Sequence, residues 1–176
     1  MAQKSLAPFV VYLASFYIVW SFAWVYGVYP WAVRNLGDTT LLFALINIAF
    51  RFAIWVLPVF WYLRGVDGVD PIQYLCLKEQ WKRGLVVGFL LSLINLAGNV
   101  ARFPPATWHG PYVTWNSILS TSILVGFFEE VPFRGFILQK LEERFSYWTS
   151  VVISSALFVG IHLPGGMLKS LTSGGL

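Results

Sequence analysis

Charged residues and cysteine are both scarce in this chain of 176 residues. Only 11% of the residues are charged and 57% are hydrophobic, whereas a soluble domain usually carries about a quarter charged residues. The single cysteine, Cys76, excludes an intramolecular disulfide and a zinc cluster built from cysteines. The basic excess, a net charge of +4, lies between apolar runs, which indicates membrane topology rather than nucleic-acid binding. The composition therefore predicts a protein whose solvent is the lipid bilayer.

Long apolar runs separate the few charges. A helix crosses the hydrocarbon of a bilayer with about 20 residues. Apolar runs of this order cover Ser5–Val33, Thr39–Leu63, Gly84–Ala101, Thr114–Phe128 and Tyr147–His162, and the fourth is expected to continue as helix to Arg144. The sequence thus predicts an all-α fold, a polytopic transmembrane helical bundle of about five spans, in a single membrane domain over residues 1–176.

The basic residues between these runs predict the orientation in the membrane. With the N-terminus in the cytoplasm, seven Lys or Arg residues lie on the cytoplasmic side and three on the other side. This distribution favours a cytoplasmic N-terminus. The protein is expected to be an integral protein of the plasma membrane. The segment Pro71–Arg83 mixes apolar and basic residues, which fits a helix on the cytoplasmic membrane surface or an ordinary polar loop.

Ionisable residues inside apolar runs are costly, so each is a candidate functional residue. Glu130 and Arg134 are four residues apart, so on a helix they can neutralise each other. Glu129 is then left without a partner in its own helix, and a carboxylate in a water-poor pocket suits general acid–base catalysis. Arg51 interrupts the second run and either answers an acidic neighbour or lines a cavity, or it has a functional role.

His162 reaches the depth of Glu129 if the last two helices form an antiparallel hairpin that turns near Phe145. Glu129 lies 16 residues before Phe145 and His162 lies 17 after it, so both are about 25 Å from the turn. The polar residues Gln139–Arg144 are expected to project into the cytoplasm. A carboxylate and an imidazole buried between two spans can deprotonate a water or share a metal ion. The alternative is a Glu–Arg–His cluster that only holds helices together. His109 is interpreted as an exposed loop residue.

Two motifs resemble those of a known family. Glu129–Arg134 (EEVPFR) fits E-E-x-x-x-R, and Phe158–His162 (FVGIH) fits F-x-x-x-H on the next helix. Together they resemble the first two motifs of the CPBP family of intramembrane proteases. That family includes the type II CAAX prenyl endopeptidases and the lysostaphin resistance protein A-like proteins. The resemblance indicates a CPBP-like core at about residues 114–165.

The resemblance implies roles for four residues. Glu129 corresponds to the catalytic glutamate, His162 to the histidine that works with it on the attacking water, and Glu130 and Arg134 to supporting positions. It implies a membrane-embedded endopeptidase that acts on a peptide or protein substrate, which in this family can be lipidated. It also implies a divalent metal, zinc, as a candidate cofactor.

One family element has no counterpart in the sequence. Members carry a further H-x-x-x-N or H-x-x-x-D motif on a later span, and no histidine follows His162 here. A hydrolytic site needs a group that stabilises the developing oxyanion as well as a base. The sequence therefore predicts a chain that is incomplete at its C-terminus. It leaves a non-catalytic membrane immunity or scaffold protein as the alternative.

Overall fold

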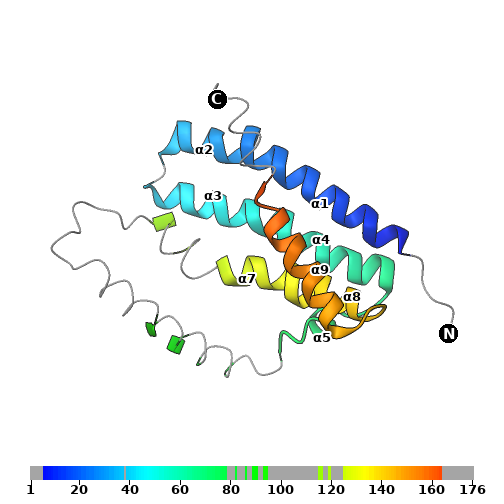
Figure 1. Cartoon of the computed structure of the whole chain (residues 1–176). Helices are drawn as coiled ribbons and strands as arrows, with labels where there is room; N and C mark the ends of the chain where they lie inside the picture. Colours follow the sequence, from blue (N-terminus) through cyan, green and yellow to red (C-terminus); the bar gives the residue numbers. More distant parts are fainter. Residues whose placement is uncertain are drawn as a thin grey trace.

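The computed structural model of the chain describes residues 6–37, 39–78 and 125–163, and single residues between 82 and 119. All regular structure in these ranges is helical, with no strand among them, which confirms the all-α fold class (Figure 1). Most of the predicted third span, Gly84–Ala101, and the loop with His109 lie outside the described residues.

Two long helical stretches run antiparallel in residues 7–67 (Figure 1). The first consists of α1 (Ala7–Tyr26) and α2 (Val28–Leu36), and the second of α3 (Leu41–Arg51), the π-helix η1 (Phe52–Val56), α4 (Leu57–Tyr62) and the π-helix η2 (Leu63–Asp67). Gly27 lies between α1 and α2. A larger residue does not fit at this position, because an added Cβ would lie only 2.7 Å from the carbonyl oxygen of Ala23. Thr40 starts the return stretch by accepting a hydrogen bond from the backbone N–H of Phe43 at 3.1 Å.

Both stretches are suited to a lipid environment. Ala7–Leu36 and Leu41–Asp67 are each long and apolar enough to cross a membrane. Their outward side chains are apolar as well, since Ile18 is 59% and Trp61 is 71% exposed. Water-facing surfaces rarely carry apolar area of this extent, so the helices indicate a membrane protein. These two helices agree with the first two predicted spans, and the predicted total of about five is not confirmed.

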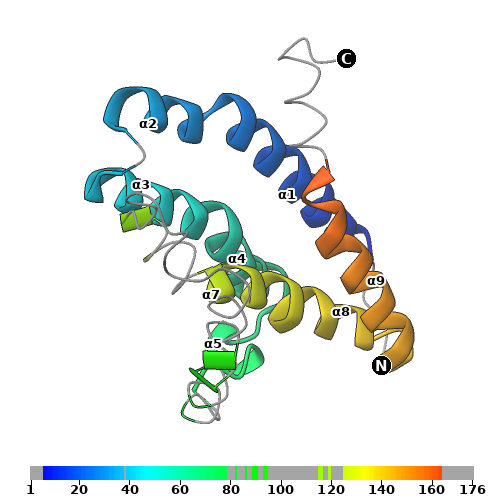
Figure 2. The ribbon, with the colours of Figure 1, turned by 60° about the vertical axis from the view of Figure 1, so that its left-hand side comes forward.

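The last described elements form a helical hairpin. α7 (Val125–Glu130), the π-helix η5 (Val131–Leu138) and α8 (Gln139–Glu142) form one continuous stretch, and α9 (Tyr147–Gly160) follows it. The turn between them includes Phe145, as the sequence predicted. Ser146 caps α9 by accepting a hydrogen bond from the N–H of Thr149 at 3.4 Å. Figure 2 shows α9 leaving α8 at a steep angle.

The predicted fifth span is shorter in the structure than expected. α9 has 14 residues, a length of about 21 Å against about 30 Å of hydrocarbon. Its C-terminal end rests on α1, where the Tyr17 hydroxyl donates to the carbonyl oxygen of Leu157. The fifth transmembrane span is therefore not confirmed, because the helix ends at Gly160.

A short segment after η2 packs against the bundle. α5 (Pro71–Tyr74) is a single turn that Asp70 caps by accepting a hydrogen bond from Ile72 N–H at 3.1 Å. Leu75 is buried, and its Cδ2 lies 3.1 Å from the position of a Cβ added to Gly135 of η5. The first half of the segment predicted as a surface helix or polar loop therefore contacts the protein core. Most of residues 79–83 lie outside the described chain.

Contacts between aromatic rings join four helical stretches: the two long stretches in residues 7–67 and the two helices of the hairpin. Phe16 of α1 lies 5.3 Å from Trp55 of η1 and 6.0 Å from Phe133 of η5, measured between ring centroids. Trp55 and Phe133 are 5.9 Å apart, and Phe158 of α9 packs edge-on against Phe133 at 5.2 Å. Each such pair contributes about 1 kcal/mol beyond its area burial. We call Phe16, Trp55, Phe133 and Phe158 the aromatic layer, which fixes how the four stretches align.

Candidate functional site

The candidate site lies about one helical turn beyond the aromatic layer. Trp20, Arg51, Glu129 and His162 are each four residues from the aromatic ring on their own stretch. Residues four apart on a helix share a face, so the alignment that brings the rings together also brings these residues near one another. The Glu129 carboxylate interacts electrostatically with His162 and Arg51. We call these four residues the polar layer.

Glu129 is half-buried near the end of α7. None of the hydrogen bonds or ion pairs described by the structure joins its carboxylate to His162 or Arg51. Direct contact between Glu129 and His162 is therefore not among the described interactions. Figure 2 shows the two helices of the hairpin diverging away from their turn.

His162 follows the end of α9 and is oriented by the turn before it. Its Nδ1 atom lies 3.0 Å from the carbonyl oxygen of Phe158, and the two rings are in edge contact at 5.3 Å. Because a carbonyl oxygen only accepts, Nδ1 carries the proton in this contact. The neutral imidazole then has its lone pair on Nε2. The side chain is exposed, so the expected burial is wrong for His162.

Glu130 and Arg134 form the ion pair that the sequence predicted. The Arg134 guanidinium donates to Oε1 of Glu130 across one helical turn. Both side chains are more than half exposed, at 53% for Glu130 and 62% for Arg134. The pair is therefore confirmed, but it lies at the surface of the described chain and not in its core.

Arg51 enters the site from the second helical stretch. Its guanidinium carbon lies 6.0 Å from the ring centroid of Trp20 and 5.6 Å from that of Trp24, distances at which a cation is attracted to an indole face. One turn earlier, Asn47 donates a hydrogen bond to Asn116 at 2.7 Å. Asn47 and the two tryptophans are not among the residues expected from the sequence, although the four-residue spacing of Asn47 and Arg51 in an apolar run was a usable signal.

A cavity of about 330 Å³ opens between η5 and α9. Phe133 and Phe158 line it together with Arg134, Ser154 and Ser155. Ser154 is buried, and its hydroxyl donates to the carbonyl oxygen of Phe133 at 3.2 Å. Phe158 lines the cavity and is also in edge contact with the His162 ring, which itself is not part of the lining.

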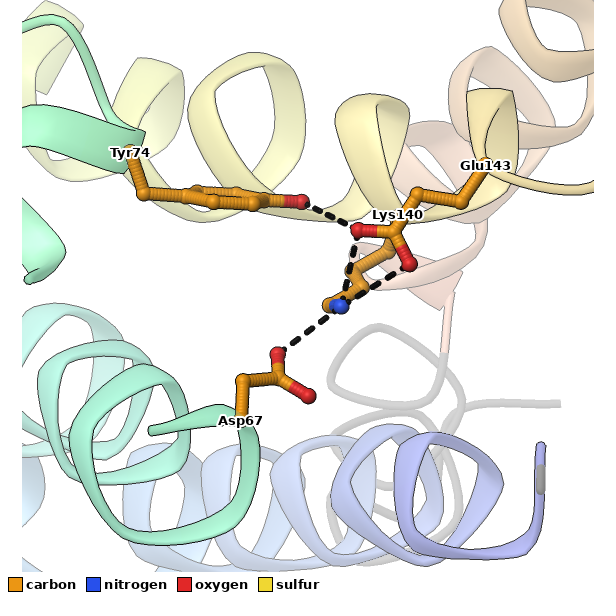
Figure 3. Close-up of polar contacts among 4 residues, drawn as sticks. All are labelled: Asp67, Tyr74, Lys140 and Glu143. Carbon is orange, nitrogen blue, oxygen red and sulfur yellow. Dashed lines mark hydrogen bonds and ion pairs between the residues drawn. The ribbon is translucent and has the colours of Figure 1, made fainter. Parts of the chain in front are cut away.

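A second polar cluster lies at the turn end of the hairpin (Figure 3). Lys140 Nζ is 2.8 Å from Asp67 Oδ2 and 2.8 Å from Glu143 Oε1, and the Tyr74 hydroxyl donates to the same Glu143 oxygen at 3.0 Å. The Lys140 and Asp67 side chains are only 10% and 7% exposed. We call these four residues the lysine cluster. Lys140 is therefore packed against the protein, while the cytoplasmic position expected for Gln139–Arg144 stays a prediction.

Opposing effects set the protonation of the lysine cluster. Burial disfavours the charged form of Lys140, but the hydrogen bonds and charges of Asp67 and Glu143 outweigh it and raise the Lys140 pKa above its ordinary value. Burial, together with the charge of Glu143, also raises the pKa of Tyr74. The folded protein thus holds both protons more tightly than an unfolded chain.

Comparison with known proteins concerns the part of the chain that contains the hairpin. Residues 111–176 match a family model described as type II CAAX prenyl endopeptidase Rce1-like. The resemblance to the CPBP family is confirmed. We call residues 111–176 the CPBP-like segment; it contains all four predicted site residues, whose roles stay predictions. No curated protein and no solved structure matches the chain.

The donor set of the CPBP-like segment can be compared with a zinc site. A catalytic zinc ion usually has three protein ligands and one open position. Glu129 and His162 offer two donors, and the described residues contain no group of three or more His, Cys, Asp or Glu side chains that could hold a metal. These residues alone do not fit a complete zinc site, so zinc stays a prediction.

Proposed function

We propose that the protein is a membrane-embedded endopeptidase of the CAAX prenyl protease type, in which Glu129 and His162 act on the attacking water. One observation supports the proposal: Glu129 and His162 each lie four residues beyond the contacting rings of Phe133 and Phe158, inside the segment that matches the family model. The family match also supports a peptide or protein as substrate.

The chemistry follows from the two side chains. The Glu129 carboxylate takes one proton from a water molecule, and the water oxygen attacks the carbonyl carbon of the peptide bond. Nε2 of His162 accepts a hydrogen bond from the same water and so orients its oxygen, because Nδ1 is already engaged with Phe158. The C–N bond then breaks as Glu129 passes its proton to the leaving nitrogen. The step needs no other reactant.

The proposal also covers the chemical class of the substrate, a lipidated peptide, and the location of the protein in the membrane. A lipidated peptide suits the cavity beside Phe158, because the lining combines aromatic rings with hydroxyl groups and Arg134. The seven-to-three distribution of basic residues supports a cytoplasmic N-terminus. The plasma membrane is the location that we propose. The site would then lie inside the bilayer, near its cytoplasmic surface.

Cleavage of a prenylated reporter peptide by the full-length protein in proteoliposomes tests the proposal. We expect Glu129→Gln and His162→Ala each to lower kcat/KM by about a hundredfold or more, with little change in melting temperature. Glu142→Gln is the matched control, since Glu142 is exposed at the end of α8 and outside the polar layer. Unchanged cleavage by Glu129→Gln would overturn the assignment.

A non-catalytic scaffold or immunity protein is the second candidate function. The observation that favours it is the electrostatic link between Glu129, Arg51 and His162, which joins three helical stretches without direct contact. If this link is only structural, Glu129→Gln lowers the melting temperature and the wild-type protein shows no cleavage. The same two measurements therefore separate the two candidates.

A further inference from the structure

We propose that one face of the second helical stretch binds a short file of water molecules that leads to the polar layer. The face carries Asn47, Arg51 and Trp55, which follow one another at intervals of four residues and so lie on the same side of a helix. We call these three residues the polar face. The inference rests on the proposed function, because hydrolysis consumes a water molecule that has to reach a site between apolar helices. Its test needs no substrate.

Two hydrogen-bond donors of the polar face are buried without an acceptor. The indole Nε1 of Trp55 and the Nε atom of Arg51 have no hydrogen-bond partner in the described part of the chain. Trp55 as a whole is only 2% exposed. A buried donor without an acceptor destabilises the folded state, and water molecules are common partners of such groups inside proteins. The two donors therefore predict bound water beside them.

The ring of Trp20 brings these two donors into one neighbourhood. Its centroid lies 4.8 Å from that of Trp55 and 6.0 Å from the guanidinium carbon of Arg51. Both side chains thus adjoin the same indole of α1. A water oxygen accepts two hydrogen bonds, so a small number of water molecules beside this indole can satisfy both donors.

Hydrogen-bonding groups continue from Arg51 toward the start of α3 and stop in the other direction. Asn47, one turn before Arg51, is 4% exposed and donates to Asn116 at 2.7 Å. A carboxamide both donates and accepts, so this pair extends the line of polar groups. On the other side the aromatic layer follows, where the ring of Phe133 lies 5.9 Å from that of Trp55. The file therefore enters from the Asn47 end and stops at the aromatic layer.

The alignment of two helical stretches places the end of the file at the depth of the candidate site. α7 packs against η1, and η5 packs against η1 and α4, so the second helical stretch and the first helix of the hairpin run in the same direction. Trp55 and Phe133 are in contact between them. Four residues before this contact, the two stretches carry Arg51 and Glu129. Water bound beside Arg51 is therefore level with the proposed base.

The accessibility of cysteines in proteoliposomes measures hydration of the polar face, because a hydrophilic thiosulfonate reacts with the thiolate, which apolar surroundings disfavour. Cys76→Ser removes the single cysteine of the full-length chain, and Asn47→Cys then places a thiol on the polar face. Leu45→Cys is the outward-facing control, and Val59→Cys is a control that is buried like Asn47 but lies beyond the aromatic layer. We expect Asn47→Cys to be modified at least about tenfold faster than either control.

A second variant keeps the test decisive if Asn47→Cys does not fold, as judged by its melting temperature. Arg51→Cys reports on the next turn and should also react at least about tenfold faster than the controls. Folded variants that react no faster than Leu45→Cys and Val59→Cys would overturn the inference. That result, combined with loss of cleavage in Glu129→Gln, would leave the proposed function standing. Fast modification in a protein that cleaves no peptide would instead retain the water file and reject the peptidase.

Discussion

Nδ1 of His162 donates a hydrogen bond to the carbonyl oxygen of Phe158, four residues earlier, across 3.0 Å. The Phe158 ring also packs against the imidazole at 5.3 Å and against Phe133 at 5.2 Å. The four-residue spacing of the F-x-x-x-H motif thus has a physical basis in this chain. The phenylalanine aligns α9 with η5 through its ring and sets the histidine tautomer through its backbone.

The first prediction concerns this tautomer. In the neutral imidazole of His162, Nδ1 should carry the proton and Nε2 should be unprotonated, because Phe158 offers only an acceptor. ¹⁵N spectra of histidine-labelled protein can show this, since the chain contains only two histidines and His109→Gln leaves one. A neutral His162 with its proton on Nε2 would contradict the hydrogen bond from Nδ1 to Phe158. Nε2 would then have no lone pair with which to accept a hydrogen bond from the attacking water.

The second prediction concerns the ion pair beside the site. Glu130→Gln should change the free energy of unfolding by less than about 1 kcal/mol, because exposed ion pairs contribute little and both partners are more than half exposed. Denaturation of the purified protein in detergent measures this. The matched comparison is Glu129→Gln, which should abolish cleavage without a larger loss of stability. A loss confined to Glu130→Gln would support a structural role for the cluster.

The third prediction concerns the lysine cluster. Lys140→Met should lower the free energy of unfolding by about 3 kcal/mol, because it leaves the Asp67 carboxylate buried without its cation. Lys78→Met is the matched control, since Lys78 is exposed and its replacement should cost little. Equal stability of the two variants would show that the cluster does not hold the hairpin to the second helical stretch.

The fourth prediction concerns alkaline pH. Both Lys140 and Tyr74 have a raised pKa in the folded protein, so the folded state holds protons that the unfolded chain releases first. Their contribution is fully present below their unfolded pKa values of about 10. It is lost as the pH rises through the folded values. Melting temperatures between about pH 9 and 12 should therefore fall more steeply for the wild type than for Lys140→Met combined with Tyr74→Phe. Parallel curves would contradict this assignment.

Local features of the hairpin could be predicted from the sequence. The pairing of Glu130 with Arg134 depends only on helical spacing, and the turn near Phe145 depends on a break in apolar residues. The placement of Glu129 and His162 at equal depth also agrees with the Phe133–Phe158 contact. Glu129 lies four residues farther than Phe133 from the connection between the two helices, and His162 lies four residues farther than Phe158. These features need no knowledge of partners from distant parts of the chain.

Features that depend on tertiary contacts could not be predicted in this way. Asp67 and Lys140 are 73 residues apart, and nothing in the pattern around Lys140 distinguishes it from a solvated charge. The exposure of His162 depends on α9 ending at Gly160, although the apolar run continues past it. The sequence alone does not assign a role to Arg51, because its neighbours Trp20 and Trp24 belong to another helix.

The eight-residue π-helix η5 separates the two ends of the hairpin helix. Glu129 precedes it and meets the polar layer, while Lys140 follows it and meets Asp67. The wider turns of η5 set the rotation between these two side chains. Removing one residue between them would rotate one end relative to the other by roughly a quarter of a turn, so the two side chains could not both keep their present positions. In this helix the number of residues is therefore as much a determinant of the site as their identity.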